Sequence, residues 1–74
     1  MTPHTLTYGG VEYRIEFERG DDGWCGTLYE GKTKIGQAGS IPDKLRLPDA
    51  VIRNSITVAA RFMLAERQQR RPGK

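Results

Sequence analysis

The sequence contains few of the residues that build catalytic and metal sites. Its 74 residues include one cysteine, Cys25, and one histidine, His4. A single cysteine excludes an internal disulfide, which fits a reducing compartment. His4 stands in a polar N-terminal stretch, and Cys25 falls in an expected strand, where a small buried residue is the common role. We therefore predict no catalytic residue, no metal site and no cofactor, and a protein that is not an enzyme.

Long apolar runs are also absent. The longest covers residues 62–65, far short of a membrane span. Residues 1–10 have neither the basic region nor the apolar region of a signal peptide. The glycines fall at expected turns or in strands, and none opens a helix as a phosphate-binding loop requires. We expect a cytoplasmic protein without membrane contact.

The charge is unevenly divided along the chain. Residues 1–31 hold two basic and six acidic side chains, a net of −4, whereas residues 32–74 hold ten basic and three acidic ones, a net of +7. Such polarity can attract an anionic partner or keep a small protein soluble. No repeat or linker divides the chain, so we expect one domain over residues 1–71 and a loose tail over residues 72–74.

An alternation of apolar and polar residues predicts the first secondary structure. In residues 11–18 the apolar side chains Val11, Tyr13, Ile15 and Phe17 point one way, and charged side chains point the other. This period of two is typical of an antiparallel strand with one buried and one wet face.

Further strands are expected on both sides of it. Gly9 and Gly10 predict a two-residue hairpin to a preceding strand, because glycine accepts the positive φ of primed turns. A strand over residues 24–30 follows, and Gly26 inside it indicates a bulge or close packing by a helix. Residues 34–38 are read as a short edge strand, although the pattern leaves open whether they form one.

Residues 48–67 are the longest periodic segment, and they predict a helix that begins near Pro48 and Asp49. Its apolar residues form two neighbouring rows, which are Ile52, Ile56, Ala59 and Met63, and Val51, Val58 and Phe62. Ala60 and Leu64 lie at one margin, so the apolar arc covers more than half of the circumference. Either the sheet holds this helix on two sides, or part of the arc meets another chain.

Together these elements predict an α+β fold, an antiparallel meander of three or four strands with one C-terminal helix packed on one face. The expected core comprises Val11, Tyr13, Ile15, Phe17, Leu28, Ile35, Ile52, Ile56, Ala59, Phe62 and Met63.

Two kinds of binding remain open. The wide apolar arc and the small size of the chain indicate protein–protein interaction. The protein would then form a homodimer or act as an adaptor or regulator. The candidate contacts are Trp24, Tyr29, Ala60 and Leu64.

Nucleic-acid binding is the alternative. Arg53, Thr57 and Arg61 are spaced four apart and so share one helix face that could follow phosphates. The basic C-terminal end would extend this surface, and its residues are Arg67, Arg70 and Arg71. Against this interpretation, Glu12, Glu16 and Glu18 outnumber Arg14 on the wet face of the sheet. We place protein–protein interaction first.

The succession YRIEFERGDDGWCGTLYE, followed by a helix, resembles the layout of HicB-type antitoxins and other small bacterial proteins with three strands and one helix. The matching part is a strand, an acidic turn with glycine and the next strand. The leucine-proline-glycine signature of HicB-like proteins does not follow in residues 27–31. The resemblance therefore predicts the fold and assigns no functional residue.

Overall fold

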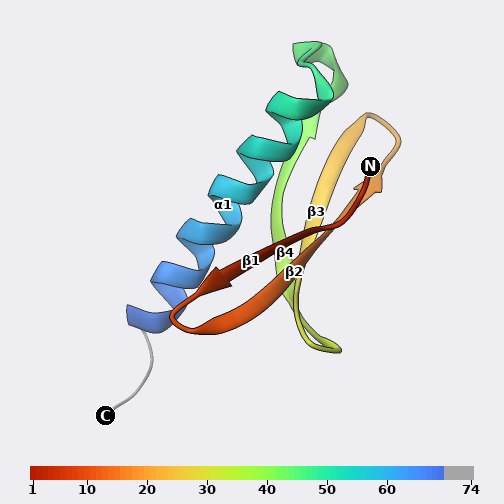
Figure 1. Ribbon diagram of the computed structural model, residues 1–74. Coiled ribbons are helices and arrows are strands. Elements are labelled where there is room, and N and C mark those ends of the chain that lie inside the picture. The colour runs from red at the N-terminus through yellow and green to blue at the C-terminus, as the bar shows by residue number, and fades with distance from the viewer. Residues whose placement is uncertain (70–74) are drawn as a thin grey trace.

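The computed structural model describes residues 1–69, which form a four-stranded sheet and a C-terminal helix (Figure 1). The elements in chain order are β1 (His4–Tyr8), β2 (Val11–Arg19), β3 (Gly23–Glu30), β4 (Thr33–Pro42), the 3₁₀ turn η1 (Asp43–Leu45) and α1 (Asp49–Gln69). The predicted α+β class is confirmed.

The sheet is an antiparallel meander in the order β1-β2-β3-β4. The β1–β2 turn has φ of 59° at Gly9 and 79° at Gly10, and Tyr8 pairs with Val11 across it. Positive φ at both central positions matches the twist of a two-residue hairpin, which explains the glycine pair. Each strand therefore returns directly beside its predecessor.

The edge strand β4 is longer than the segment 34–38 expected from the sequence. It runs over ten residues, with register shifts against β3 between Gly26 and Thr27 and between Leu28 and Tyr29. Extra residues in one strand of a pair bend it and increase its twist. The weak alternation of β4 is the reason that the sequence pattern underestimates its length.

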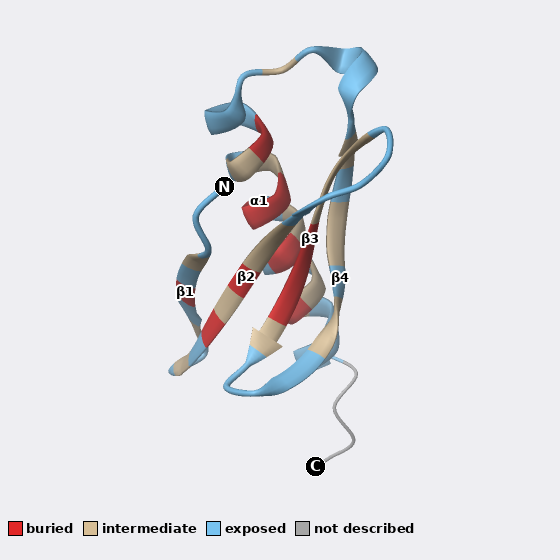
Figure 2. Ribbon diagram, turned by 90° about the vertical axis from the view of Figure 1, so that its right-hand side faces the viewer, coloured by how far each residue is buried: buried red, intermediate tan, exposed pale blue. Residues whose placement is uncertain are grey.

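The helix α1 covers one face of the sheet, and the core lies between them (Figure 2). The helix contributes a row spaced four residues apart, and strands β1, β2 and β3 contribute the opposing side chains. The buried apolar residues are Leu6, Tyr13, Ile15, Leu28, Ile52, Ile56, Ala60 and Leu64.

Two paired glycines let the helix approach the sheet closely. Gly26 of β3 lies opposite Gly39 of β4 in the register. A Cβ at Gly26 would stand 2.4 Å from Cγ2 of Ile56, and a Cβ at Gly39 would stand 3.2 Å from Cβ of Ala59. A side chain at Gly26 would therefore displace Ile56, and one at Gly39 would crowd Ala59, which confirms the expectation of close helix packing at Gly26.

This docking corrects the predicted core at the helix. Phe62, expected inside, is 73% exposed, whereas Leu6, Ala60 and Leu64 are buried. Ile56 and Ala59 lie over the glycines and so face the sheet. Each residue of a helix is turned by about 100° from the one before it, so Phe62 points about 120° away from Ile56 and lies on the outer side of α1. Other predicted core residues are half-buried against the same cluster, and these are Val11, Phe17, Ile35 and Met63.

Truncation of the central helix residue tests the core. Ile56 is 1% exposed, so Ile56→Ala should lower the free energy of unfolding by about 2–5 kcal/mol through lost burial and the cavity left behind. Val58→Ala removes a side chain that is 43% exposed and should cost less than about 1 kcal/mol. Urea denaturation of both variants measures this, and equal losses would contradict the assigned rotation of α1.

Gly26→Ala tests the close approach. The added methyl must displace Ile56, and overpacking of this kind costs about 1–3 kcal/mol. Gly20→Ala is the matched control, because a Cβ there meets only Gly23 O at an ordinary 3.5 Å. A Gly26→Ala protein as stable as the Gly20→Ala protein would show that α1 does not rest on this glycine.

Candidate interaction surface on the helix

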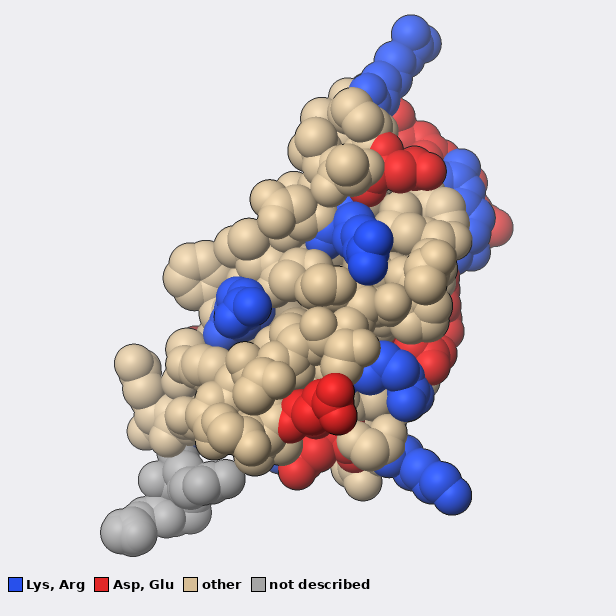
Figure 3. All heavy atoms as spheres, in the orientation of Figure 1, with Lys and Arg blue, Asp and Glu red and all other residues tan. Residues whose placement is uncertain are grey.

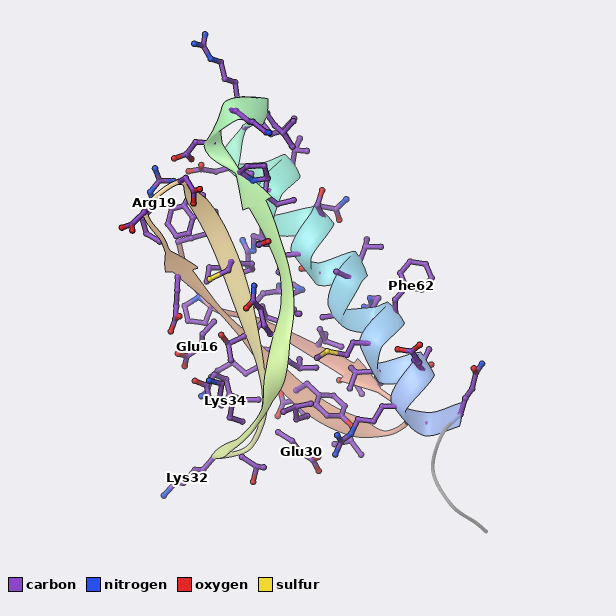
Figure 4. The ribbon with its side chains drawn as sticks, turned by 180° about the vertical axis from the view of Figure 1, so that it is seen from behind. Glu16, Arg19, Glu30, Lys32, Lys34 and Phe62 are labelled. Atoms are coloured by element: carbon purple, nitrogen blue, oxygen red, sulfur yellow. The ribbon has the colours of Figure 1, made fainter. Side chains whose placement is uncertain are left out.

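The outward side of α1 carries an apolar stripe. Phe62 is 73% exposed, and Val51 and Val58 are each 43% exposed. Figure 4 shows Phe62 projecting from α1 away from the sheet. Burial of a phenylalanine side chain is worth about 1.5–3 kcal/mol, so this exposure leaves a substantial apolar contact unused.

Helix geometry explains why the stripe faces outward. Val51, Val58 and Phe62 lie at steps of seven and four residues, which keeps them in one row along the helix. The row that contains Ile56 faces the sheet, where Ile56 packs on Gly26 and Ala59 packs on Gly39. One helix therefore presents a buried apolar row and an exposed one on opposite sides.

Shallow hollows flank Phe62 on both sides. One, of about 330 Å³, is lined by Tyr8 of β1 and by Val58, Arg61, Phe62 and Ala65 of α1. The other, of about 570 Å³, is lined by Ala59, Phe62, Met63, Ala65, Glu66 and Gln69. The stripe is thus a ridge with an aromatic ring between two depressions, a shape that can interlock with side chains of another helix.

Within residues 1–69, the side chains expected to contact nucleic acid do not form one exposed surface. Thr57 is buried, with 9% exposed, and its Oγ1 donates a hydrogen bond to the carbonyl of Arg53 at 2.8 Å. Arg53 is half-buried, with Nη2 3.3 Å from Nδ1 of His4 in β1. Arg61 and Arg67 are exposed. The expectation that Thr57 lies on an exposed phosphate-binding row was wrong, because the sheet covers its side of α1.

The predicted basic end lies partly outside the described residues, since Arg70 and Arg71 follow residue 69. On the face shown in Figure 3, lysine and arginine side chains form separate patches among uncharged and acidic ones. Phosphate binding by several cations needs them close enough to act on one backbone. The visible face does not provide such a cluster.

Two of the predicted protein contacts are unavailable. Ala60 is 0% and Leu64 is 1% exposed, so both belong to the core and cannot contact a partner. They were placed at the margin of the apolar arc, but the sheet lies on that side. Trp24 and Tyr29 are half-buried, and each lies under an arginine, with Arg19 5.6 Å and Arg14 4.9 Å from the respective ring centroid.

The sequence interpretation missed the outward stripe as a site. Its only signal was an apolar arc wider than one sheet can cover, which did predict surplus apolar surface. Which row is surplus depends on the rotation of α1 about its own axis. Periodicity is the same for every rotation, so Phe62 could not be separated from the core residues.

The open face of the sheet is polar. The Nε atom of Arg14 donates to Oε2 of Glu16 at 2.9 Å, and the Arg14 guanidinium covers the Tyr29 ring. Both charged side chains of this ion pair are about 40% exposed, so the pair contributes little stability. This face thus keeps its charges in solvent and does not compete with the helix as an apolar contact surface.

An ion pair joins η1 to the sheet. Arg19, at the end of β2, donates two hydrogen bonds to the Asp43 carboxylate, with Nη1 2.7 Å from Oδ1. The backbone N–H of Asp43 also donates to Asp22 O at 2.8 Å. The hydrogen bonds from Arg19 lower the pKa of Asp43 below its ordinary value, and the pKa of Arg19 is raised in turn. The contact ties the start of η1 to the end of β2, and because both side chains are about half exposed its contribution to stability is small.

Two general site types are not seen within residues 1–69. No three His, Cys, Asp or Glu side chains of this range stand close enough to hold a metal ion. Likewise, this range contains no helix that is both long enough and apolar enough to cross a membrane.

No protein-family model, curated protein or solved structure gives a significant match to this chain. The resemblance to HicB-type antitoxins accordingly stays a prediction about layout.

Protonation of Asp43 tests the ion pair. Because its pKa is lower in the folded chain than the value of about 3.9 in the unfolded one, the stabilisation is complete above that pH and is lost as the pH falls through the lowered pKa. Because both side chains are about half exposed, Asp43→Asn should lower the melting temperature only slightly at neutral pH and should flatten its decline in acid. Thermal melts from pH 7 to about pH 2 measure this.

The matched control is Asp21→Asn, which changes another exposed aspartate of the same end of the sheet. It should keep the acid dependence of the parent protein. An Asp43→Asn protein with the parent's full pH dependence would show that the ion pair does not stabilise the fold.

Proposed function

We propose that this protein is a small non-enzymatic binding module that acts through protein–protein interaction, using the outward face of α1. The observation that carries the proposal is the position of Phe62, a large aromatic side chain that is 73% exposed in line with Val51 and Val58. Aromatic anchors dominate the binding energy of protein interfaces, whereas an isolated folded chain gains nothing from exposing one.

The surroundings of Phe62 support the same function. Most residues that line its two hollows are apolar side chains of α1, and the others are Tyr8, Arg61, Glu66 and Gln69. A buried apolar centre with a polar rim is the usual composition of an interface. The stripe also belongs to a helix, whose rigid backbone presents its contacts in a fixed arrangement.

Nucleic-acid binding through the arginines is the competing proposal, and it receives less support. Thr57 is buried, Arg53 is directed to His4, and Arg61 stands beside the apolar stripe. The two proposals differ in salt dependence, because phosphate contacts weaken steeply with added salt and apolar contacts do not.

Site-specific photocrosslinking in cells tests the protein-binding proposal. Phe62 is replaced by benzoylphenylalanine, which keeps an aromatic ring at the centre of the stripe. We expect light-dependent adducts that are digested by protease and unchanged by nuclease. The matched control is the same replacement at Lys32, an exposed residue of the β3–β4 turn far from the stripe (Figure 4), which should give none of these adducts.

Either of two results would refute the proposal. Nuclease-sensitive adducts at position 62 would assign the face to nucleic acid. Identical adducts at positions 62 and 32 would show unspecific contact. Titration of the purified protein with a random DNA duplex at low and high salt is the direct test of the competing proposal.

A further inference from the structure

Strand β1 is an edge of the sheet that carries none of the usual protection against further pairing. Its residues, His4–Tyr8, include no lysine, no glutamate and no proline, and its register with β2 shows no bulge. The other edge, β4, has two register shifts and ends at Pro42. Charges, prolines and bulges are the features that keep an exposed edge from pairing with another strand. The two edges therefore differ, and β1 is the one that remains open to pairing.

The backbone of β1 directs hydrogen-bonding groups outward. In a two-residue hairpin the residues that close the turn, here Tyr8 and Val11, form a hydrogen-bonded pair, and such pairs alternate along the strands. The N–H and C=O groups of Thr5 and Thr7 consequently point away from β2. Within residues 1–69, no backbone hydrogen bond beyond the sheet ladder reaches β1. Thr5 and Thr7 are exposed, so a further strand has access to these groups.

Helix α1 runs along β1 and forms a wall beside this edge (Figure 1). At one end Nη2 of Arg53 lies 3.3 Å from Nδ1 of His4, and at the other a Cβ on Gly9 would stand 2.6 Å from Nε2 of Gln68. Leu6 is buried, so the side chains of β1 that alternate with the exposed threonines face α1. A strand added beside β1 would therefore follow the flank of α1 and turn every second side chain towards it.

The hollow of about 330 Å³ lies where such a strand would place its side chains. Tyr8 of β1 lines it on the side of the sheet, and Val58, Arg61, Phe62 and Ala65 of α1 line the rest. In strand addition, pockets of this kind receive alternate side chains of the extended segment. The hollow thus connects the apolar stripe of α1 with the open edge of the sheet.

The charge beside this edge selects the kind of segment. Arg61 is exposed, and within residues 1–69 it forms no ion pair. Arg53, which contacts His4 of β1, is a second cation on this flank. A second copy paired through its own β1 would bring the same two arginines to the shared face, where like charges repel. An acidic side chain of a different protein complements Arg61 instead.

We propose that an extended segment of a partner protein adds to β1 as a further strand of the sheet, in the groove between β1 and α1. Its backbone bonds to the outward groups of Thr5 and Thr7. An apolar side chain of the segment enters the hollow beside Phe62, and an acidic side chain on the same face pairs with Arg61. This inference rests on the proposed protein-binding function and names the form and chemistry of the partner.

The length of β1 predicts a reversible contact. Its 5 residues span about 17 Å, so only a short stretch of the partner can pair with it. Such a stretch buries less than the roughly 800 Å² per partner of a standard interface. We expect a dissociation constant of about 10–100 µM rather than a permanent complex.

Random peptides displayed on phage and selected against the purified full chain supply the probe. We expect enriched sequences in which an acidic and an apolar residue stand at an even spacing, because alternate residues of a strand share a face. The strongest peptide should slow hydrogen exchange of the Thr5 and Thr7 amides at least about tenfold and leave exposed β4 residues such as Gln37 unchanged. Peptides that protect no β1 amide, or a selection without any enriched sequence, would overturn strand addition.

Removal of one outward N–H tests the backbone contact. An edge strand accepts proline where its N–H faces solvent, so Thr7→Pro should keep the fold and weaken the peptide at least about tenfold. Thr7→Val is the matched control, because it keeps the N–H and should stay within about twofold of the parent affinity. Fluorescence anisotropy of the labelled peptide measures both affinities, and circular dichroism melts monitor the fold. Equal affinities of the two folded variants would contradict pairing along β1.

Charge reversal on α1 gives an independent readout that leaves β1 intact. Arg61→Glu places a like charge against the acidic side chain and should weaken the same peptide at least about tenfold. Arg67→Glu makes the same change at an exposed position beside Ile35 of β4 and should stay within about threefold of the parent affinity. Equal losses in the two variants would show general attraction between the charges and would overturn the pairing with Arg61.

Photocrosslinking at position 62 separates failure of this inference from failure of the proposed function. Adducts that disappear in the Thr7→Pro protein and persist in the Thr7→Val protein support both. Adducts that persist equally in the two variants keep the binding function and overturn strand addition. Adducts with twice the mass of the chain assign the face to a second copy and overturn the acidic segment of another protein. Absence of all adducts refutes the binding function itself.

Discussion

The contact between α1 and the paired glycines of β3 and β4 governs the arrangement of this molecule. Ile56 lies over Gly26 so closely that a Cβ there would collide with it, and a Cβ at Gly39 would crowd Ala59. Because interiors are close-packed, this contact fixes how near the helix lies and how it is turned about its axis. Both the core and the exposed stripe follow from that rotation.

The rotation of α1 leaves apolar surface in solvent that an interface would bury. It buries Ala60 and Leu64 completely and leaves Phe62 in solvent, although the two rows are of comparable apolar character. A 74-residue chain forms a limited core, since a small domain buries only about 60% of its unfolded surface. Association through the outer row would bury additional apolar surface in a chain whose own core is small. The limited core is therefore a physical reason for the proposed protein-binding function.

Much of the fold could be predicted from local patterns. The alternation in β2 and the Gly9-Gly10 turn identified the first hairpin, and the periodic segment identified α1 to within two residues at each end. The strand β4 was underestimated, because its bulges interrupt the alternation that defines a strand. The candidate site was predicted less well, since Ala60, Leu64 and Thr57 were expected at the surface and Phe62 in the core.

The sequence by itself determined the element types, their order and the presence of more apolar helix surface than one sheet can cover, because these depend on local spacing and turn chemistry. Tertiary structure alone decided which row of α1 is surplus. Helical periodicity sets the angles between side chains but not the rotation of the whole helix, and that rotation depends on the space above Gly26 and Gly39. For this reason Phe62 and its hollows became visible only in the folded chain.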